Sequence, residues 1–192
     1  MPAISVKIRF GFIAFAGVSL LTALWSGLAR MGWDLPVPNI EFVSLHGPLM
    51  AIGFLGTLIG LERAAAVNQW WIYGIPLFSL LSIAALMIDA PLAVITLPAI
   101  LAAVLQTVFF ASLYRRQPAE HFVVLTLSSV ALCIGNVIWF AEAPLSQVVP
   151  WWAGFLVLMI AGERLELTRI RRPPLSVRVL FRVCVTIVMV GL

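Results

Sequence analysis

The sequence predicts an all-α protein, a polytopic transmembrane helix bundle, and three observations support this fold class. Hydrophobic residues make up 62% of the 192 residues, and charged residues make up only 10%. A soluble domain carries about a quarter charged residues, so lipid rather than water is the main solvent expected for this chain. The apolar residues also form long runs separated by short polar connections, and part of the sequence repeats at a fixed offset.

Six apolar runs are long enough to cross a membrane as helices, because about 20 apolar residues span the roughly 30 Å hydrocarbon core. They cover residues 10–30, 43–65, 70–89, 91–113, 121–141 and 148–167. A seventh run begins near Ser176 and reaches Leu192, which is too short for a complete crossing. We therefore expect six full spans and a partial seventh, in one transmembrane domain that covers residues 1–192.

The repeat relates the second span to the sixth. A Gly-Phe-Leu triplet, an isoleucine and a Glu-Arg pair recur with the same spacing at an offset of 101 residues: residues 53–55, Ile59, Glu62 and Arg63 return as residues 154–156, Ile160, Glu163 and Arg164. Both spans would run in the same direction, so the repeat is parallel. Repeat one covers about residues 9–113 and repeat two about residues 120–192. Either the chain is a fragment, or its last segment is re-entrant or packed elsewhere; the missing counterpart of the fourth span favours the fragment.

The positions of lysine and arginine predict the orientation, because short cytoplasmic loops are enriched in these residues. With the N-terminus in the cytoplasm, only Arg30 falls on the outer side, and eleven basic residues fall on the inner side. These are Lys7, Arg9, Arg63, Arg115, Arg116, Arg164, Arg169, Arg171, Arg172, Arg178 and Arg182. The expected location is a bacterial-type inner membrane, with multiple passes and a cytoplasmic N-terminus.

Several functional classes find no support in the sequence. The net charge of +4 is not gathered into a basic stripe with interleaved aromatic residues, so no nucleic-acid partner is expected. The phosphate-binding loops, catalytic triads and zinc-binding helices typical of soluble enzymes are not found either. The expected partner is the lipid bilayer, together with other subunits or further copies of the chain. Whether the protein is an enzyme stays open.

His46 is the first candidate functional residue, near the outer end of the second span. On a regular helix Gly53 and Gly60 follow it at seven-residue spacing on nearly the same face, and Gly56 lies beside them. An imidazole can ligate haem iron, and glycines allow a flat macrocycle to approach the backbone. Glycines at this spacing also form close helix–helix contacts in membranes. Both interpretations stay open from spacing alone.

A resemblance supports the first interpretation. Residues Leu45–Met50, followed by Gly53–Leu55, resemble the second helix of haem–copper oxidase subunit I, where the histidine ligates the low-spin haem. They resemble more closely the NnrS family of haem- and copper-containing membrane proteins linked to nitric oxide stress. The resemblance implies a haem-binding protein with a redox or nitric-oxide-related role. It implies His46 as the metal ligand, with Gly53, Gly56 and Gly60 as cofactor-binding residues.

The sequence departs from these families in one respect. A second axial ligand is missing, because His121 is predicted at the inner interface and the repeat position of His46 is Gln147. No cluster of histidines supports a copper site in this chain alone. An alternative function is therefore a small-molecule or ion transporter, or a non-catalytic membrane scaffold subunit, built from parallel four-helix repeats.

Two further groups of polar residues lie in the spans. The pairs Glu62–Arg63 and Glu163–Arg164 are predicted near the inner interface. They are either symmetric carboxylates that handle protons or cations, or local or cross-repeat salt bridges to Arg63 and Arg164, which in the cross-repeat form would clamp the two repeats. In the fifth span, a polar stripe that includes Ser128 and Asn136 is predicted to form hydrogen bonds with another helix.

Overall fold

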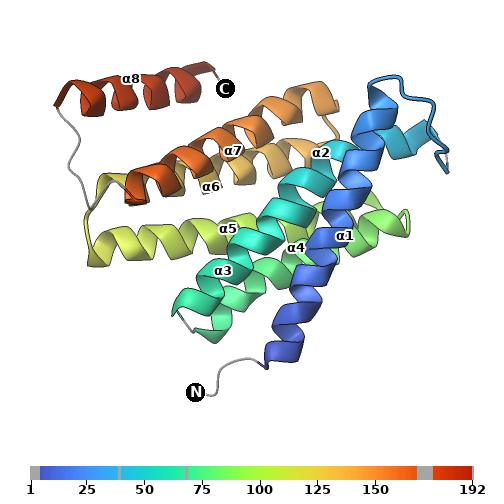
Figure 1. Cartoon of the computed structure of the whole chain (residues 1–192), viewed down its shortest axis with the longest axis horizontal. Helices are drawn as coiled ribbons and strands as arrows, with labels where there is room; N and C mark the ends of the chain where they lie inside the picture. Colours follow the sequence, from blue (N-terminus) through green and yellow to red (C-terminus); the bar gives the residue numbers. More distant parts are fainter. Residues whose placement is uncertain (1–4, 39, 68, 168–174, 192) are drawn as a thin grey trace. The chain divides into compact units, whose positions relative to one another are not determined.

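The structure is a computed structural model that describes residues 5–38, 40–67, 69–167 and 175–191. All regular elements in these ranges are helical (Figure 1). The chain divides into two compact units, Met1–Leu105 and Gln106–Leu192. The boundary falls inside helix α5 (Leu92–Arg116), so each unit is described below by itself.

Within the described ranges, six helical segments are long and apolar enough to cross a membrane. They are Val6–Arg30, Phe42–Val67, Trp70–Met87, Leu92–Arg116, Glu120–Phe140 and Leu145–Leu167. Each of them coincides with one of the six predicted spans, so the predicted all-α fold with six long apolar helices is confirmed. The composition and the helix lengths are those of an integral membrane protein.

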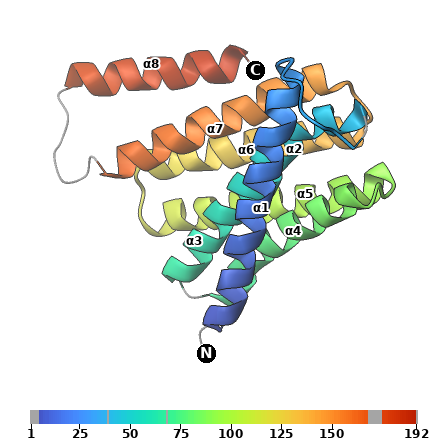
Figure 2. The same ribbon diagram turned by 45° about the vertical axis from the view of Figure 1, so that its right-hand side comes forward.

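The first unit is built around helix α1 (Val6–Arg30). Its buried face carries the small residues Ala16, Ser19, Ala23 and Ser26, spaced three or four apart. Small residues at this spacing let a neighbouring backbone approach closely. The second span packs on this face, and both Figures 1 and 2 show α1 crossing it. Helix α4 (Gly74–Met87) follows the short 3₁₀ helix η3 (Trp70–Tyr73) and packs on the same span.

The second span is not one regular α-helix, in contrast to the prediction. It begins as a 3₁₀ helix, η1 (Ile40–Leu45), and continues as α2 (His46–Pro48), a π-helix η2 (Leu49–Gly56) and α3 (Thr57–Val67). Pro48 has no N–H to donate, and its ring clashes with the carbonyl of the preceding turn. Glycines at positions 53 and 56 further weaken the preference for regular α-helix. These residues explain why the bonding pattern changes within this span.

The second unit contains the end of α5 and three further helices. Helices α6 (Glu120–Phe140) and α7 (Leu145–Leu167) form an antiparallel hairpin and lie side by side in Figures 1 and 2. Helix α8 (Leu175–Gly191) is shorter, with 17 residues. It coincides with the predicted seventh run, and its crossing of the membrane stays a prediction. The sixth span, α7, is a continuous α-helix, so it differs locally from its proposed repeat partner.

Three helices end in the same hydrogen-bonded turn. After α4, the Ala90 N–H donates to the Ala85 carbonyl at 3.0 Å, and after α6 the Ala143 N–H donates to the Ile138 carbonyl at 3.3 Å. This is the bonding of a Schellman cap, which needs a residue with positive φ just past the helix. Gly32 fills that position after α1, whereas Asp89 (φ 53°) and Glu142 (φ 60°) fill it after α4 and α6.

Candidate functional site

His46 lies half-buried against helix α1. Its Nδ1 atom is 2.8 Å from the carbonyl oxygen of Ala23. A carbonyl oxygen only accepts hydrogen bonds, so Nδ1 must be the donor in this contact. A neutral His46 therefore keeps its lone pair on Nε2. A backbone carbonyl that holds one ring nitrogen is a common arrangement for histidines that bind a metal through the other nitrogen.

Gly27 makes room for this imidazole. A Cβ atom built on Gly27 would lie 2.7 Å from Nδ1 and 3.1 Å from Cε1 of His46, so the ring rests directly on the α1 backbone. The same Ala23 carbonyl also accepts a hydrogen bond of 3.0 Å from the Ser26 hydroxyl. The imidazole therefore contacts α1 where Gly27 has no side chain. There the Ala23 carbonyl accepts hydrogen bonds from both His46 and Ser26.

The three glycines predicted as cofactor-binding residues pack against protein side chains. With a Cβ atom added, Gly53 would meet Ser19 of α1 at 3.0 Å, Gly56 would meet Ser79 of α4 at 3.1 Å, and Gly60 would meet Ile75 of α4 at 2.5 Å. These contacts leave a flat macrocycle no space on this face. The contacts give the glycines a helix-packing role, which is the second of the two interpretations of their spacing.

The predicted alignment of His46 with these glycines is not found. His46 faces α1, whereas Gly60 faces α4, and Gly53 lies between α1 and Ile83 of α4. The seven-residue alignment assumes regular α-helix. The π-helix Leu49–Gly56 lies between His46 and Gly60. Its hydrogen bonds link residues five apart instead of four, so each of its residues turns the chain by a smaller angle than in an α-helix. The two ends of the span therefore contact different helices.

The Glu-Arg pairs lie close to the ends of their helices. Glu62 is exposed on α3 and Arg63 is half-buried beside it; Glu163 is half-buried and Arg164 is exposed on α7. The two pairs belong to different units. Their roles as a clamp between repeats or as carboxylates that handle protons therefore stay predictions.

The polar stripe on α6 forms hydrogen bonds with α7, as predicted. The Ser128 hydroxyl donates to the Phe155 carbonyl at 2.7 Å, and the Trp152 indole N–H donates to Asn136 Oδ1 at 3.0 Å. All of these side chains are buried. The ring of Trp152 also meets Trp139 edge to face, with 5.4 Å between ring centroids. These hydrogen bonds and the ring contact therefore hold α6 against α7 inside the second unit.

His121 lies at the start of α6, next to Glu120, and its predicted place at the membrane interface stays a prediction. Only 3% of its surface is exposed, and its ring stacks at a tilt on Phe122 with 4.1 Å between centroids. Packing within the second unit therefore buries this imidazole.

Over the described ranges, no three or more His, Cys, Asp or Glu side chains are grouped so that they could hold a metal ion. Comparison with known families gives one result: the family described as "Domain of unknown function (DUF8744)" matches residues 9–192, nearly the whole chain. The chain belongs to the DUF8744 family. No curated protein and no solved structure matches it.

Sequence reasoning missed Ala23 and Gly27 as the partners of His46 in this DUF8744 protein. One signal could have indicated them. Ala16, Ser19, Ala23 and Ser26 recur at helical spacing in α1, and Gly27 follows directly. Such a stripe predicts a close helix contact. It does not show which residue of the partner helix fills the contact.

Proposed function

We propose that this integral membrane protein holds a haem through Nε2 of His46 and has a redox or nitric-oxide-related role. The observation that supports the proposal is the hydrogen bond from Nδ1 to the Ala23 carbonyl, because it selects the tautomer whose Nε2 can ligate iron. The resemblance of residues 45–55 to the NnrS and oxidase helices supplies the identity of the group. The proposal assigns no reaction.

The residues of the chain have distinct tasks in this proposal. The Ala23 carbonyl orients the imidazole, and Gly27 lets the ring rest on the α1 backbone. The bound haem would supply electron transfer or gas binding. His46 fits such a group as a ligand, whereas Gly53, Gly56 and Gly60 do not fit as its cradle because side chains already cover them. A further ligand, where the group needs one, would come from another subunit.

A scaffold subunit is the second candidate function. The packing of three glycines favours it, because Gly53, Gly56 and Gly60 all contact side chains of neighbouring helices. The polar groups of α6 likewise bond to α7. A bundle in which these groups serve packing needs no ligand. The transporter alternative has no specific contact in its favour.

Absorption spectra of the protein, purified from native membranes with its partners, separate these functions. The haem proposal expects a Soret band and a positive pyridine haemochrome assay. His46→Gly should lose the band, and added imidazole should restore it. His121→Gln is the matched control, because it removes the other histidine of the chain. A colourless protein refutes the haem proposal and favours the scaffold, whereas full haem occupancy in His46→Gly would refute His46 as the ligand.

We also propose that the N-terminus lies in the cytoplasm of a bacterial-type inner membrane. The support is the eleven-to-one distribution of basic residues between the two sides of the predicted spans. Single cysteines introduced at residues 115–118 should resist impermeant maleimides in intact cells and react after lysis. Labelling in intact cells would reverse the orientation.

The parallel repeat is the last part of the proposal. It rests on the identical spacing of the Gly-Phe-Leu triplets and Glu-Arg pairs. Disulfide cross-linking tests it, because two pseudo-symmetric spans should give matching cross-link patterns for cysteines placed 101 residues apart. Unrelated patterns would refute it.

A further inference from the structure

The end of the second unit near the α5–α6 connection combines two apolar grooves with a set of arginines. The first groove, about 320 Å³, lies between α6 and α8, and its lining includes Glu120, Val123, Leu127, Phe181 and Arg182. The second, about 300 Å³, lies between α5 and α6 and is lined by Ala111, Tyr114, Val123, Thr126 and Leu127. Val123 and Leu127 line both grooves, so they form a ridge between them.

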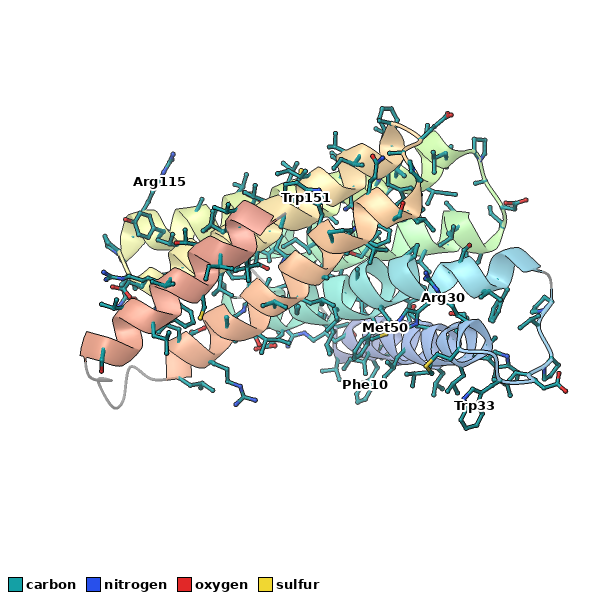
Figure 3. The ribbon with its side chains drawn as sticks, turned by 90° about the horizontal axis from the view of Figure 1, so that it is seen from above. Phe10, Arg30, Trp33, Met50, Arg115 and Trp151 are labelled. Carbon is teal, nitrogen blue, oxygen red and sulfur yellow. The ribbon has the colours of Figure 1, made fainter. Side chains whose placement is uncertain are left out.

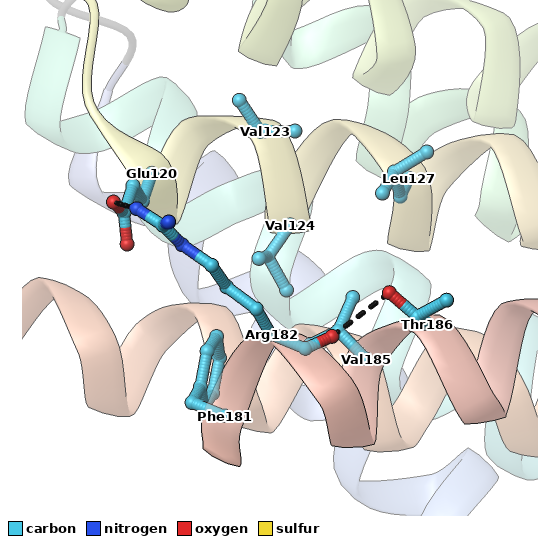
Figure 4. A pocket seen from close by; sticks show the side chains of 8 residues that line it. All are labelled: Glu120, Val123, Val124, Leu127, Phe181, Arg182, Val185 and Thr186. Carbon is cyan, nitrogen blue, oxygen red and sulfur yellow. Dashed lines mark hydrogen bonds and ion pairs between the residues drawn. The ribbon is translucent and has the colours of Figure 1, made fainter. Parts of the chain in front are cut away.

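The first groove has a charged end. Figure 4 shows Arg182 of α8 reaching Glu120 at one end, with Val123, Leu127 and Phe181 along the groove. The side chain of Arg182 remains 59% exposed, and that of Glu120 remains 38% exposed. Because a guanidinium has five N–H donors, Arg182 can contact Glu120 and still donate to a further anion.

Two more arginines lie at the same end of the unit. Arg115 and Arg116 are the last residues of α5, and both are exposed. Figure 3 shows Arg115 extending away from the helices. Tyr114, which precedes them, lines the second groove. Among Arg115, Arg116, Arg182 and Glu120, three side chains are positive and one is negative, which leaves two positive charges.

We propose that this surface binds one anionic diacyl phospholipid of the bilayer. Its acyl chains lie in the two grooves on either side of the Val123–Leu127 ridge, and its phosphate contacts Arg182 and the arginines that end α5. The grooves are apolar and adjoin the lipid expected around α6, which fits acyl chains. The arginines Arg115, Arg116 and Arg182 at this end fit an anionic headgroup, because basic sites at helix ends bind such lipids. This proposal needs the membrane placement of the chain and is independent of haem.

Native mass spectrometry of the full chain in detergent, titrated with phosphatidylglycerol and with phosphatidylcholine, tests the proposal. Each arginine near a membrane surface contributes roughly fivefold to the binding of an anionic lipid. Glu120 offsets one of the three arginines, so phosphatidylglycerol should bind roughly 25-fold more tightly than phosphatidylcholine. Arg115→Gln combined with Arg116→Gln should remove most of that preference, and Arg182→Lys should retain it. Arg30→Gln, at the end of α1, is the charge control.

A second pair of variants tests the grooves. Val123→Trp fills both grooves at their ridge and should reduce the binding of both lipids. Val137→Trp is the matched control, because Val137 is also on α6, is 47% exposed compared with 41% for Val123, and lines neither groove. Equal binding of the two lipids, equal effects of the two tryptophans, or cross-linking of a second copy through Val123 would each overturn the proposal.

Discussion

Replacing Gly27 by alanine tests the contact between His46 and α1. The new Cβ would lie 2.7 Å from Nδ1 of His46, whereas ordinary contacts between such atoms are about 3.5–4.0 Å. The imidazole must therefore move by roughly 1 Å, which breaks the hydrogen bond of 2.8 Å to the Ala23 carbonyl. Overpacking costs about 1–3 kcal/mol and the lost bond about 0.5–1.5 kcal/mol. Alanine recovers about 0.5–1 kcal/mol through its higher helix propensity. The net loss of stability should be about 0.5–4 kcal/mol, centred on about 2 kcal/mol.

Gly17→Ala is the matched control for this prediction. Gly17 is in the same helix, and a Cβ atom there would meet nothing within 4 Å. Alanine at this position should leave stability unchanged or raise it by up to about 1 kcal/mol. Reversible unfolding in mixed micelles, followed by tryptophan fluorescence, gives both values. Nitrogen chemical shifts of the histidine ring report separately whether Nδ1 keeps its proton.

A double-mutant cycle separates the imidazole clash from a general effect on α1. Removing the side chain in His46→Ala should abolish most of the cost of Gly27→Ala, because the atom that obstructs the new methyl group is gone. The two changes should therefore be strongly non-additive. If Gly27→Ala is as stable as Gly17→Ala, the contact of the His46 ring with Gly27 is wrong. Additive losses of stability in the double variant would contradict it as well.

Three other predictions concern helix contacts and helix ends. Gly60→Leu should lower the yield of folded, monodisperse protein, because even a Cβ there lies 2.5 Å from Ile75; an unchanged elution profile would contradict this packing. Glu142→Gly should raise the free energy of unfolding by about 1 kcal/mol, since glycine adopts the φ of 60° without strain, and a loss of stability in a denaturant titration would contradict the turn. Trp152→Phe should cost about 1–2 kcal/mol by removing the bond to Asn136 and trimming a buried ring. A zero coupling between Trp152→Phe and Asn136→Leu in the same titration would refute that bond.

The sequence carries enough information for the spans but less for their contacts. Uninterrupted apolar runs determine where helices cross a membrane, because each backbone group in lipid must be paired within its own segment. The polar stripe on α6 was predictable for a related reason: Ser128 and Asn136 in an apolar run require partners. Which residues supply those partners depends on packing, so the carbonyl of Phe155 could not be named in advance.

His46 shows where the prediction of the site is incomplete. Its position near the start of the second span follows from hydropathy, but its direction depends on the local helix type. The pattern that places His46 above Gly60 assumes 3.6 residues per turn. Pro48 and the π-helix that follows it change this geometry, and no periodicity in the sequence reveals the change. The predicted glycine face is therefore real as a packing surface, while His46 belongs to the contact with α1.

The π-helix of Leu49–Gly56 constrains how the gene can change in length. Its bonds enclose one more residue than α-helical bonds, so deleting one residue would allow the span to become regular α-helix. Because a π-helical residue turns the chain by less than the about 100° of an α-helical residue, losing one residue while becoming α-helix largely preserves the relative orientation of the two ends. His46 would then stay at Ala23 and Gly60 at Ile75. A deletion at residues 57–59, in the regular helix α3 (Thr57–Val67), would instead turn Gly60 by about 100° relative to His46. Single-residue deletions should therefore be tolerated better at residues 49–56 than at residues 57–59.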